Sequence, residues 1–352
     1  MQTDYIIVGQ GLCGTLLSYE LMKAGKQVIV IDESNPSTAG KVASGLINPV
    51  TGKRVVKSWM IDNLLTAAIS TYKELETRLG VTIIHPWDIL EFHPDAQHRD
   101  IFTERTPQYA AYLRIDIEEN AWKETFNFNY GIGGVTQTMI INIRLLQDEW
   151  RKNLISNDSL LEERFDMEQC TITTNKVTYK NISAERIIFC DGSAGLSNPY
   201  FARLPFALNK GEVLIAEIPD LPRHYVYKNG LKIAPWEDDK FWIGSSFEWT
   251  FENTLPSTKF REKTEWQLRN WLKLPYTITD HWASVRPATV DHKPFVGFHP
   301  GHTSVGIFNG MGAKGCSQVP YFAHQLAAHI TNQEPIMPDA DIQRFTRILS
   351  KQ

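Results

Sequence analysis

The stretch DYIIVGQGLCGTLLSYELMKAGKQVIVID, residues 4–32, contains two short apolar runs separated by a glycine-rich turn and a segment with helical spacing. The apolar runs, residues 4–8 and 28–31, have the length and composition of buried strands. The segment between them, residues 12–24, predicts a helix. A strand, a glycine turn, a helix and a second strand in this order indicate a βαβ unit with parallel strands.

The turn has the pattern Gly9-x-Gly11-x-x-Gly14, and each glycine has a mechanical reason. Gly9 permits a tight turn, Gly11 lets the backbone approach a pyrophosphate, and Gly14 lets helix and strand pack closely. The pyrophosphate would lie at the helix N-terminus, where unpaired N–H groups favour an anion. Asp32 closes the second strand and would reach a ribose hydroxyl pair. This acid disfavours the phosphorylated ribose of NADP, whereas NAD and the ADP half of FAD are both compatible with it.

Length and composition set the broad class of the protein. At 352 residues the chain is expected to form two packed domains, and 42% hydrophobic with 22% charged residues is ordinary for a globular protein. The net charge of -4 and the lack of a Lys/Arg run argue against a general nucleic-acid surface. The first predicted strand starts almost at Met1, and no apolar run approaches the roughly 20 residues of a membrane span. We therefore expect a cytoplasmic protein without a membrane anchor.

The four cysteines, Cys13, Cys170, Cys190 and Cys316, show neither CxxC pairing nor metal-ligand spacing with histidines. No metal site is predicted, and buried apolar thiols are the expected state. Cys13 lies in the glycine turn, where a helix N-terminus would favour a thiolate. Because a phosphate group would occupy that position, we interpret Cys13 as a small packing residue.

The rest of the chain predicts a second, β-rich unit interleaved with the first. A turn of small residues, 43–52, follows the strand that ends at Asp32, and residues 186–195 repeat the pattern of a buried strand that ends in glycines. Alternating patterns then indicate a largely antiparallel sheet. Helices are expected at 58–79, 141–155, 256–274 and 317–331, strands at 82–84, 89–92, 205–218, 225–234 and 241–247, and a strand or hairpin at 172–179. We assign residues 1–80, 140–205 and 281–352 to the nucleotide domain and residues 81–139 and 206–280 to a substrate domain.

Seven motifs occur together in an order that identifies a family. They are GQGLCG with Asp32, ASGLINP from Ala43, IIFCDG from Ile187, LNKGEVL from Leu208, the pair KIAPW and FWIGSSFEW, SVRPATVDHKPFVG from Ser284, and NGMGAKG from Asn309. Taken together they resemble the FAD-dependent amine oxidoreductases of the D-amino acid oxidase superfamily, the group that contains glycine oxidase and sarcosine oxidase. The resemblance covers nearly the whole chain. It implies a mixed α/β fold in which a Rossmann-like FAD-binding domain is joined to a domain whose antiparallel sheet roofs the flavin.

The resemblance also implies which residues surround FAD. The final glycine loop would run along the isoalloxazine, where backbone donors reach the ring carbonyl and stabilise charge that develops on the ring. Ser284 stands where some relatives attach the flavin through Cys, so FAD is expected to be non-covalent unless Cys316 forms that bond. Phe165, on the strand before IIFCDG, would lie near the adenine. The expected cofactor-binding residues are Gly9, Gly11, Leu12, Cys13, Gly14, Asp32, Glu33, Ala43, Ser44, Gly45, Leu46, Phe165, Cys190, Gly192, Gly310, Gly312, Ala313, Lys314 and Gly315.

Substrate binding is expected to depend on Arg286 and Lys314. An Arg guanidinium grips a carboxylate in bidentate fashion and can orient an amino acid so that its α C–H faces the flavin. The alternatives are a structural ion pair for Arg286 and a surface or oxygen-facing role for Lys314. Lys232 stands where glycine oxidase has a Tyr. The aromatic residues Trp236, Tyr225, Tyr227 and Phe247 either line the pocket or belong to the core.

These residues lead to three functional hypotheses. The first is oxidation of a primary or secondary amine that bears a carboxylate: hydride passes to FAD, the imine hydrolyses, and oxygen or another acceptor reoxidises the flavin. No side-chain acid or base is required, so none is assigned. The second is removal of a carboxymethyl group from a wobble uridine of tRNA, because residues 310–338 are similar to the FAD domain of the bifunctional enzyme with that activity. The third is a flavin-binding protein without turnover. The expected partners are a small-molecule amine and an electron acceptor, with no nucleic acid other than the tRNA of the second hypothesis.

Overall fold

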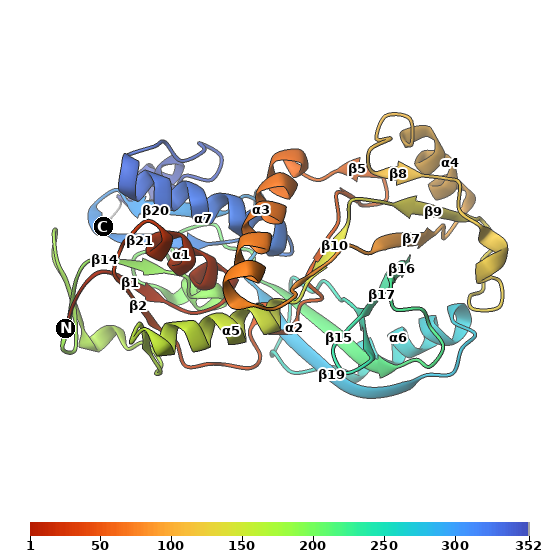
Figure 1. Ribbon diagram of the computed structural model, residues 1–352, viewed down its shortest axis with the longest axis horizontal. Coiled ribbons are helices and arrows are strands. Elements are labelled where there is room, and N and C mark those ends of the chain that lie inside the picture. The colour runs from red at the N-terminus through yellow and green to blue at the C-terminus, as the bar shows by residue number, and fades with distance from the viewer. Residues whose placement is uncertain (351–352) are drawn as a thin grey trace.

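The chain is built around two eight-stranded sheets, and the computed structural model describes residues 1–350. Figure 1 shows the first sheet, with both ends of the chain, on one side of the molecule and the second sheet on the other. The architecture is mixed α/β with no barrel, as the sequence predicts.

The first sheet has the order β11-β2-β1-β14-β13-β12, and β21 pairs with both β14 and β20. Its centre is parallel: β1 lies between β2 and β14, and β14 continues to β21. The N-terminal βαβ unit is therefore formed as predicted. The strands are β1 (Gln2–Val8), β2 (Val28–Ile31), β11 (Leu160–Leu161), β12 (Cys170–Ile172), β13 (Val177–Tyr179), β14 (Ile182–Phe189), β20 (Phe295–His299) and β21 (His302–Asn309).

Helices surround this sheet, and helix α7 packs against both α1 and α3. Helix α3 ends at Leu79 and is followed by Gly80, whose left-handed backbone (φ 69°) is a common C-terminal signal. The helices of the chain are α1 (Leu12–Lys23), α2 (Ala39–Val42), α3 (Ile61–Leu79), α4 (Ala96–Arg105), α5 (Ile143–Ser156), α6 (Thr258–Trp271), α7 (Gly315–Asn332) and α8 (Thr346–Leu349). None of those within residues 1–350 is long and apolar enough to cross a bilayer.

The second sheet has the order β19-β15-β18-β17-β16-β7-β9-β8 and is antiparallel except for the pair β16 and β7. Its strands are β7 (Asp88–Phe92), β8 (Leu113–Arg114), β9 (Ile132–Val135), β15 (Asn209–Glu217), β16 (Tyr225–Asn229), β17 (Leu231–Pro235), β18 (Lys240–Gly244) and β19 (Thr277–Arg286). Short pairings link the two halves: β3 (Leu46–Ile47), β10 (Met139–Ile141) and β6 (Ile84–His85) form one sheet, and β4 (Val50–Thr51) pairs with β5 (Val56–Lys57).

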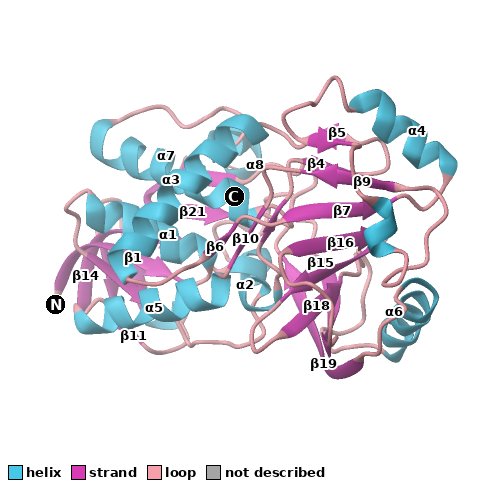
Figure 2. Ribbon diagram, turned by 45° about the vertical axis from the view of Figure 1, so that its right-hand side comes forward, coloured by secondary structure: helices cyan, strands magenta, loops and turns pink. Residues whose placement is uncertain are grey.

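The two faces of the second sheet have different neighbours. Val213, Ile215 and Trp242 belong to the same hydrophobic cluster as Leu16 of α1, so their face looks toward the nucleotide domain. The alternate residues, such as Leu214, belong to a separate cluster with Leu268 and Trp271 of α6. Figure 2 shows α6 on the far side of this sheet from α1, α3 and α7. We call the face with Val213, Ile215 and Trp242 the inner face and the face that packs against α6 the outer face. Because side chains alternate along each strand, only every second residue can reach the nucleotide domain.

Three expectations from the sequence need correction. The single strand expected at 225–234 is a hairpin, because Gly230 turns the chain with a φ of 72° between β16 and β17. Phe165 does not lie on a strand but in the irregular segment after β11, where its ring stacks on Tyr179 at 4.8 Å. The domain boundary expected at residue 281 falls inside β19, which continues in the second sheet to Arg286.

The βαβ unit depends on the missing side chain of Gly14. A Cβ at this position would lie 1.8 Å from the carbonyl oxygen of Gly9, which is backbone and cannot move aside. We expect Gly14→Ala to lower the free energy of unfolding by about 1–3 kcal/mol or more through overpacking. Thermal unfolding of the apo protein, followed by circular dichroism, measures this loss. An unchanged melting temperature would contradict the close helix–strand contact.

Candidate functional site

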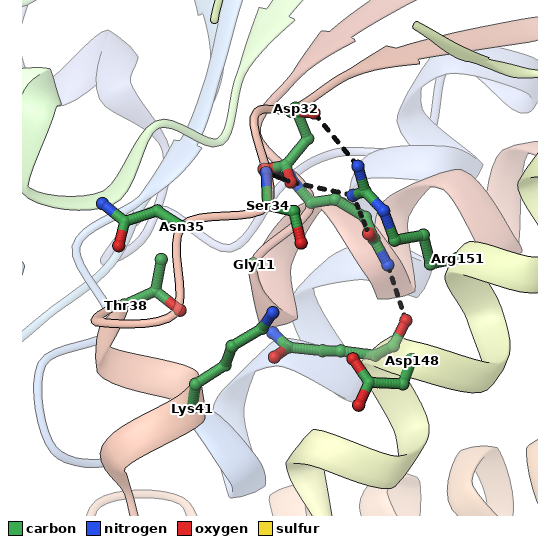
Figure 3. Close-up of a pocket in the computed structure, with 10 residues that line it drawn as sticks. Gly11, Asp32, Ser34, Asn35, Thr38, Lys41, Asp148 and Arg151 are labelled. Atoms are coloured by element: carbon green, nitrogen blue, oxygen red, sulfur yellow. Dashed lines mark hydrogen bonds and ion pairs between the residues drawn. The ribbon is translucent and has the colours of Figure 1, made fainter. Parts of the chain in front are cut away.

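The carboxylate of Asp32 lies at the end of β2 beside the N-terminus of α1. Its Oδ2 accepts a hydrogen bond from the Gln10 N–H at 2.8 Å, and its Oδ1 accepts from the Ser34 N–H at 2.8 Å and from Arg151 Nη1 at 2.9 Å. Figure 3 shows Asp32 joined to Arg151 at one end of a small pocket, with Lys41 and Asp148 toward the other end. Because Oδ2 accepts only one bond from the described residues, it keeps a lone pair for a ribose hydroxyl.

The same pocket has features that fit the ADP half of FAD. A Cβ built on Gly11 meets no protein atom within 4 Å, so the space in front of this turn is open. Helix α1 starts at Leu12, and the preceding Gly11 offers no side-chain cap, which leaves N–H groups of the first turn for an anion. Gln147 lines the pocket, is 2% exposed, and has neither its Nε2 nor its Oε1 hydrogen-bonded within residues 1–350. Buried amides are normally paired, so this one is consistent with a ligand partner.

Sequence reasoning missed Gln147 and Arg151. They are four residues apart on α5, and this spacing places both on one helix face. Arg151 donates from Nη1 to both Asp32 and Gln10 Oε1, and from Nη2 to Glu162 Oε1 at 2.9 Å. No local motif announces them. Only the packing of α5 beside α1 brings them to Asp32, more than a hundred residues away in the chain.

The other expected cofactor residues form two groups. Ala43, Ser44, Gly45 and Leu46 join α2 to β3, while Glu33 is exposed after Asp32. The second group consists of Cys190 and Gly192, after β14, and the expected residues of the final glycine loop. Asn309, a residue not predicted for the site, holds this group together. Its Nδ2 donates to Asp191 Oδ1 and to the Gly192 carbonyl at 2.9 Å, and its Oδ1 accepts from the Gly310 N–H at 2.7 Å. This ties the turn after β14 to the final glycine loop.

The final glycine loop, residues 310–315, leads into α7. The Gly312 N–H donates to the Pro287 carbonyl at 3.0 Å, which fixes the loop to the segment after Arg286. Helix α7 has no side-chain cap, so N–H groups of its first turn are available beside Ala313, Lys314 and Gly315. Such donors can stabilise negative charge.

The cysteines near these turns behave as apolar packing residues. Burial raises the pKa of the Cys13 and Cys190 thiols well above the ordinary range, and it raises the pKa of the Cys316 thiol to about 12. The thiolate is the reactive form of cysteine, so none of the three is activated in this environment.

Arg286 ends β19 on the inner face of the second sheet and is held by neutral groups. Its Nη1 donates to Asn209 Oδ1 at 2.7 Å and to the Ser246 carbonyl at 3.2 Å, and its Nη2 donates to Ser245 Oγ at 2.8 Å. A Cβ on Gly211 would lie 2.1 Å from Nη2, so the guanidinium crosses β15 over this glycine. The centre of the Phe247 ring lies 4.5 Å from Cζ of the Arg286 guanidinium. Within residues 1–350, Arg286 has no carboxylate partner, which argues against a structural ion pair.

Asn209 is a further residue that sequence reasoning missed. It is 1% exposed, and while its Oδ1 accepts from Arg286, its Nδ2 has no partner among the described residues. It therefore fixes one arm of the guanidinium and keeps a buried donor beside it. Such an orphaned donor is costly unless a ligand uses it.

Lys314 and Lys232 are two further cations in this region. Lys314 Nζ donates to Ser58 Oγ at 3.0 Å, and burial lowers the pKa of Lys314 to about 8. Burial, together with the neighbouring charges of Lys228, Arg286 and Lys314, lowers the pKa of Lys232 to about 8. Neither lysine forms an ion pair within residues 1–350. Both remain largely protonated at pH 7.

The expected aromatic residues separate into two classes. Tyr227 was expected at the pocket and is corrected here: it is fully buried on the outer face, where its hydroxyl donates to the Pro222 carbonyl at 2.7 Å. Tyr225 packs in the same outer cluster. Trp236 instead lines a cavity of about 340 Å³, which also contacts Ser44 and Ile140. Phe247 is 55% exposed and covers Arg286 from outside.

Comparison with known proteins gives a consistent assignment. The family model described as FAD dependent oxidoreductase matches residues 4–329. The chain is 22% identical to a glycine oxidase of Pseudomonas aeruginosa, with 97% of this chain and 98% of that protein covered. A crystal structure of glycine oxidase from Geobacillus kaustophilus matches with a TM-score of 0.80 at 16% identity, covering 100% of this chain and 99% of that one. That of iminodiacetate oxidase from Chelativorans sp. BNC1 matches with a TM-score of 0.75 at 18% identity, covering 97% and 98%.

The open space at Gly11 permits a test matched to that of Gly14. Its backbone (φ −66°) suits any residue, and an added methyl group meets no protein atom, so Gly11→Ala should leave the melting temperature of the apo protein unchanged. The methyl group would instead occupy the approach to the pyrophosphate. We expect FAD affinity, measured by titration of the apo protein, to fall at least about tenfold, which is ~1.4 kcal/mol. Wild-type affinity in Gly11→Ala would place the pyrophosphate elsewhere.

Asn209 can be tested by exchanging its amide for a carboxylate. Asn209→Asp would place a negative charge against Arg286 and compete with any carboxylate ligand, whereas Asn209→Ala removes both the orphaned donor and the oxygen that accepts from Arg286 without adding a charge. We expect KM for a carboxylated substrate to rise in both variants, and more strongly in Asn209→Asp. Equal KM values for the wild type and both variants would show that this guanidinium does not meet the substrate.

Proposed function

The chain belongs to the family of FAD dependent oxidoreductases, and from that membership we propose that it oxidises an amine that carries a carboxylate. Members of this family are flavoenzymes, so FAD and redox chemistry are the premise. The proposal concerns the substrate and the residues that hold it.

The observation that supports this substrate class is the state of Arg286. A guanidinium on the inner face, crossing Gly211 and held only by Asn209, Ser245 and Ser246, has a positive charge that no described residue neutralises. Burial lowers its pKa to about 10, so it stays cationic at pH 7. Leaving a buried charge unpaired is expensive, and a substrate carboxylate is the natural partner for the planar fork.

We propose that FAD lies with its diphosphate at the N-terminus of α1 and its ring beside residues 310–315. When bound, FAD accepts a hydride from the carbon next to the amine nitrogen and is reoxidised by oxygen or another acceptor. The substrate loses this hydride and a proton from nitrogen, becomes an imine, and takes up water to give a carbonyl compound and the released amine or ammonia. Arg286 and Asn209 orient the carboxylate, and no side chain has to act as a base.

The test is an absorbance spectrum of the purified protein followed by anaerobic addition of glycine, sarcosine, proline and other N-alkyl amino acids. We expect a flavin spectrum that bleaches with at least one carboxylated amine, and not with the matching amine that lacks the carboxylate. Bleaching that ignores the carboxylate would overturn the role of Arg286. A flavin spectrum that no carboxylated amine bleaches would overturn the proposed substrate class.

Arg286 itself gives a quantitative prediction. Removing a bidentate, charge-assisted contact with Arg286→Met should cost about 3 kcal/mol, or roughly a hundredfold in kcat/KM for the carboxylated amine. Arg286→Lys keeps the charge but loses the fork and should fall in between. Arg261→Met, which removes an exposed arginine on α6 at the outer face, is the matched control and should behave as wild type.

A further inference from the structure

The inner face of the second sheet carries more positive charge than one carboxylate can neutralise. Lys228 of β16 lies directly across from Lys232 of β17, and Lys232 lies across from Gly244 of β18. The next residue, Ser245, receives the hydrogen bond from Arg286 Nη2. The guanidinium of Arg286 therefore reaches the residue that follows Gly244, the cross-strand partner of Lys232. Adjacent strands are only about 4.8 Å apart, so Arg286 and Lys232 lie close together.

Only one carboxylate in the described part of the chain balances these cations, and it is already engaged. Glu91 of β7 lies across from Lys228, accepts a hydrogen bond from its Nζ at 2.6 Å, and lies 3.4 Å from His98 Nε2. The side chain of Lys232, directly beside this pair, has no ion pair or hydrogen bond within residues 1–350. Like charges on directly opposite strand positions repel, so Lys232 is destabilised where it stands.

Lys314 belongs to the final glycine loop, whose Gly312 N–H donates to the carbonyl of Pro287, the residue after Arg286. Its Nζ donates to Ser58 Oγ and has no acidic partner among residues 1–350. Its positive charge, with those of Lys228 and Arg286, contributes to the lowered pKa of Lys232. Two lysines and an arginine, drawn from β17, β19 and the final glycine loop, therefore converge without a carboxylate. A monocarboxylate bound at Arg286 would leave both lysines uncompensated.

We propose that the substrate amine carries a second acidic group, so that Arg286 and Asn209 hold one carboxylate while Lys232 and Lys314 hold the other anion. This rests on the proposed function and specifies the substrate class of that site. Lysine is a compact point charge that accepts either a carboxylate or a phosphate, so the second group can be either. A polyanion such as RNA fits less well, because the 340 Å³ cavity at the other end of β17 is lined by Glu237, Asp238 and Asp239.

The experiment compares matched pairs of amines on the FAD-loaded wild-type enzyme. The pairs are aspartate and alanine, glutamate and 2-aminobutyrate, iminodiacetate and sarcosine, and O-phosphoserine and serine, with both enantiomers where they exist. Anaerobic bleaching and steady-state turnover give kcat/KM for each. We expect at least one diacidic member to exceed its partner at least tenfold, and the phosphoserine pair separates phosphate from carboxylate.

Failure of this inference is distinguishable from failure of the proposed function. If monoacidic amines bleach the flavin as well as their diacidic partners, the second anion is wrong and the amine oxidase assignment stands. If no carboxylated amine bleaches it, both are overturned.

Lys232→Met tests the residue itself, because it removes the charge and keeps roughly the length of the side chain. We expect the diacidic preference to fall at least tenfold. Lys240→Met is the control, since it removes another lysine of the same sheet whose charge is near Asp280 at 4.0 Å, and it should leave the preference unchanged. An unchanged preference in Lys232→Met, with slower reoxidation only, would show that Lys232 faces the electron acceptor instead.

The pH dependence of the preference gives a readout that needs no variant. The groups facing Lys232 are Lys228, Glu91, Arg286 and Lys314, and its pKa is lowered to about 8. The lysine loses its proton as the pH rises through this value, so the second anion loses its partner. The diacidic preference should decline above about pH 8 in the aspartate–alanine and glutamate–2-aminobutyrate pairs, whose α-amines titrate alike. A preference that is constant from pH 7 to pH 9.5 would contradict the assignment of Lys232.

Discussion

The structure depends on the burial of one face of the second sheet against the nucleotide domain. Val213, Ile215 and Trp242 share a single hydrophobic cluster with α1, and the Trp242 indole N–H donates to the Val42 carbonyl at 2.9 Å. Because strand residues alternate between faces, this burial also decides which polar residues of the sheet look inward. Arg286, Asn209 and Lys232 are on that face, whereas Tyr227 is on the other.

The inward polar residues show an imbalance that the rest of the structure avoids. Elsewhere, buried charges are paired: Glu212 contacts Lys210 at 3.2 Å and His281 at 2.9 Å, and Glu91 contacts Lys228. At Arg286, Lys232 and Lys314 no described carboxylate forms an ion pair, and the nearby Glu91 is already paired with Lys228. Such an imbalance lowers the stability of the folded chain and raises its affinity for anions, as binding sites commonly do. It explains in physical terms why these cations are better interpreted as ligand contacts than as structural ion pairs.

The sequence predicted the nucleotide unit better than the substrate unit. Short-range rules were sufficient for β1, α1 and β2, because glycine geometry and helix periodicity act within about thirty residues. They failed for the hairpin of β16 and β17, where one apolar pattern continues across Gly230. They also failed for Phe165, which lies in an irregular segment and not on a strand. Gln147 and Arg151 lie in no motif. Asn209 and Asn309 lie within two of the motifs, but the contacts of Arg151, Asn209 and Asn309 at the site are to residues far away in the chain.

What the sequence determined by itself is therefore the βαβ unit, the family and the presence of FAD, since these follow from local spacing and from motifs in a fixed order. Tertiary structure alone decided which side chains meet. Cross-strand register brings Lys232 beside Lys228 and near Arg286, and the alternation of faces removes Tyr227 from the site. Register and burial are properties of strands that pair over long separations, so no reading of adjacent residues could have supplied the charge balance that points to the substrate.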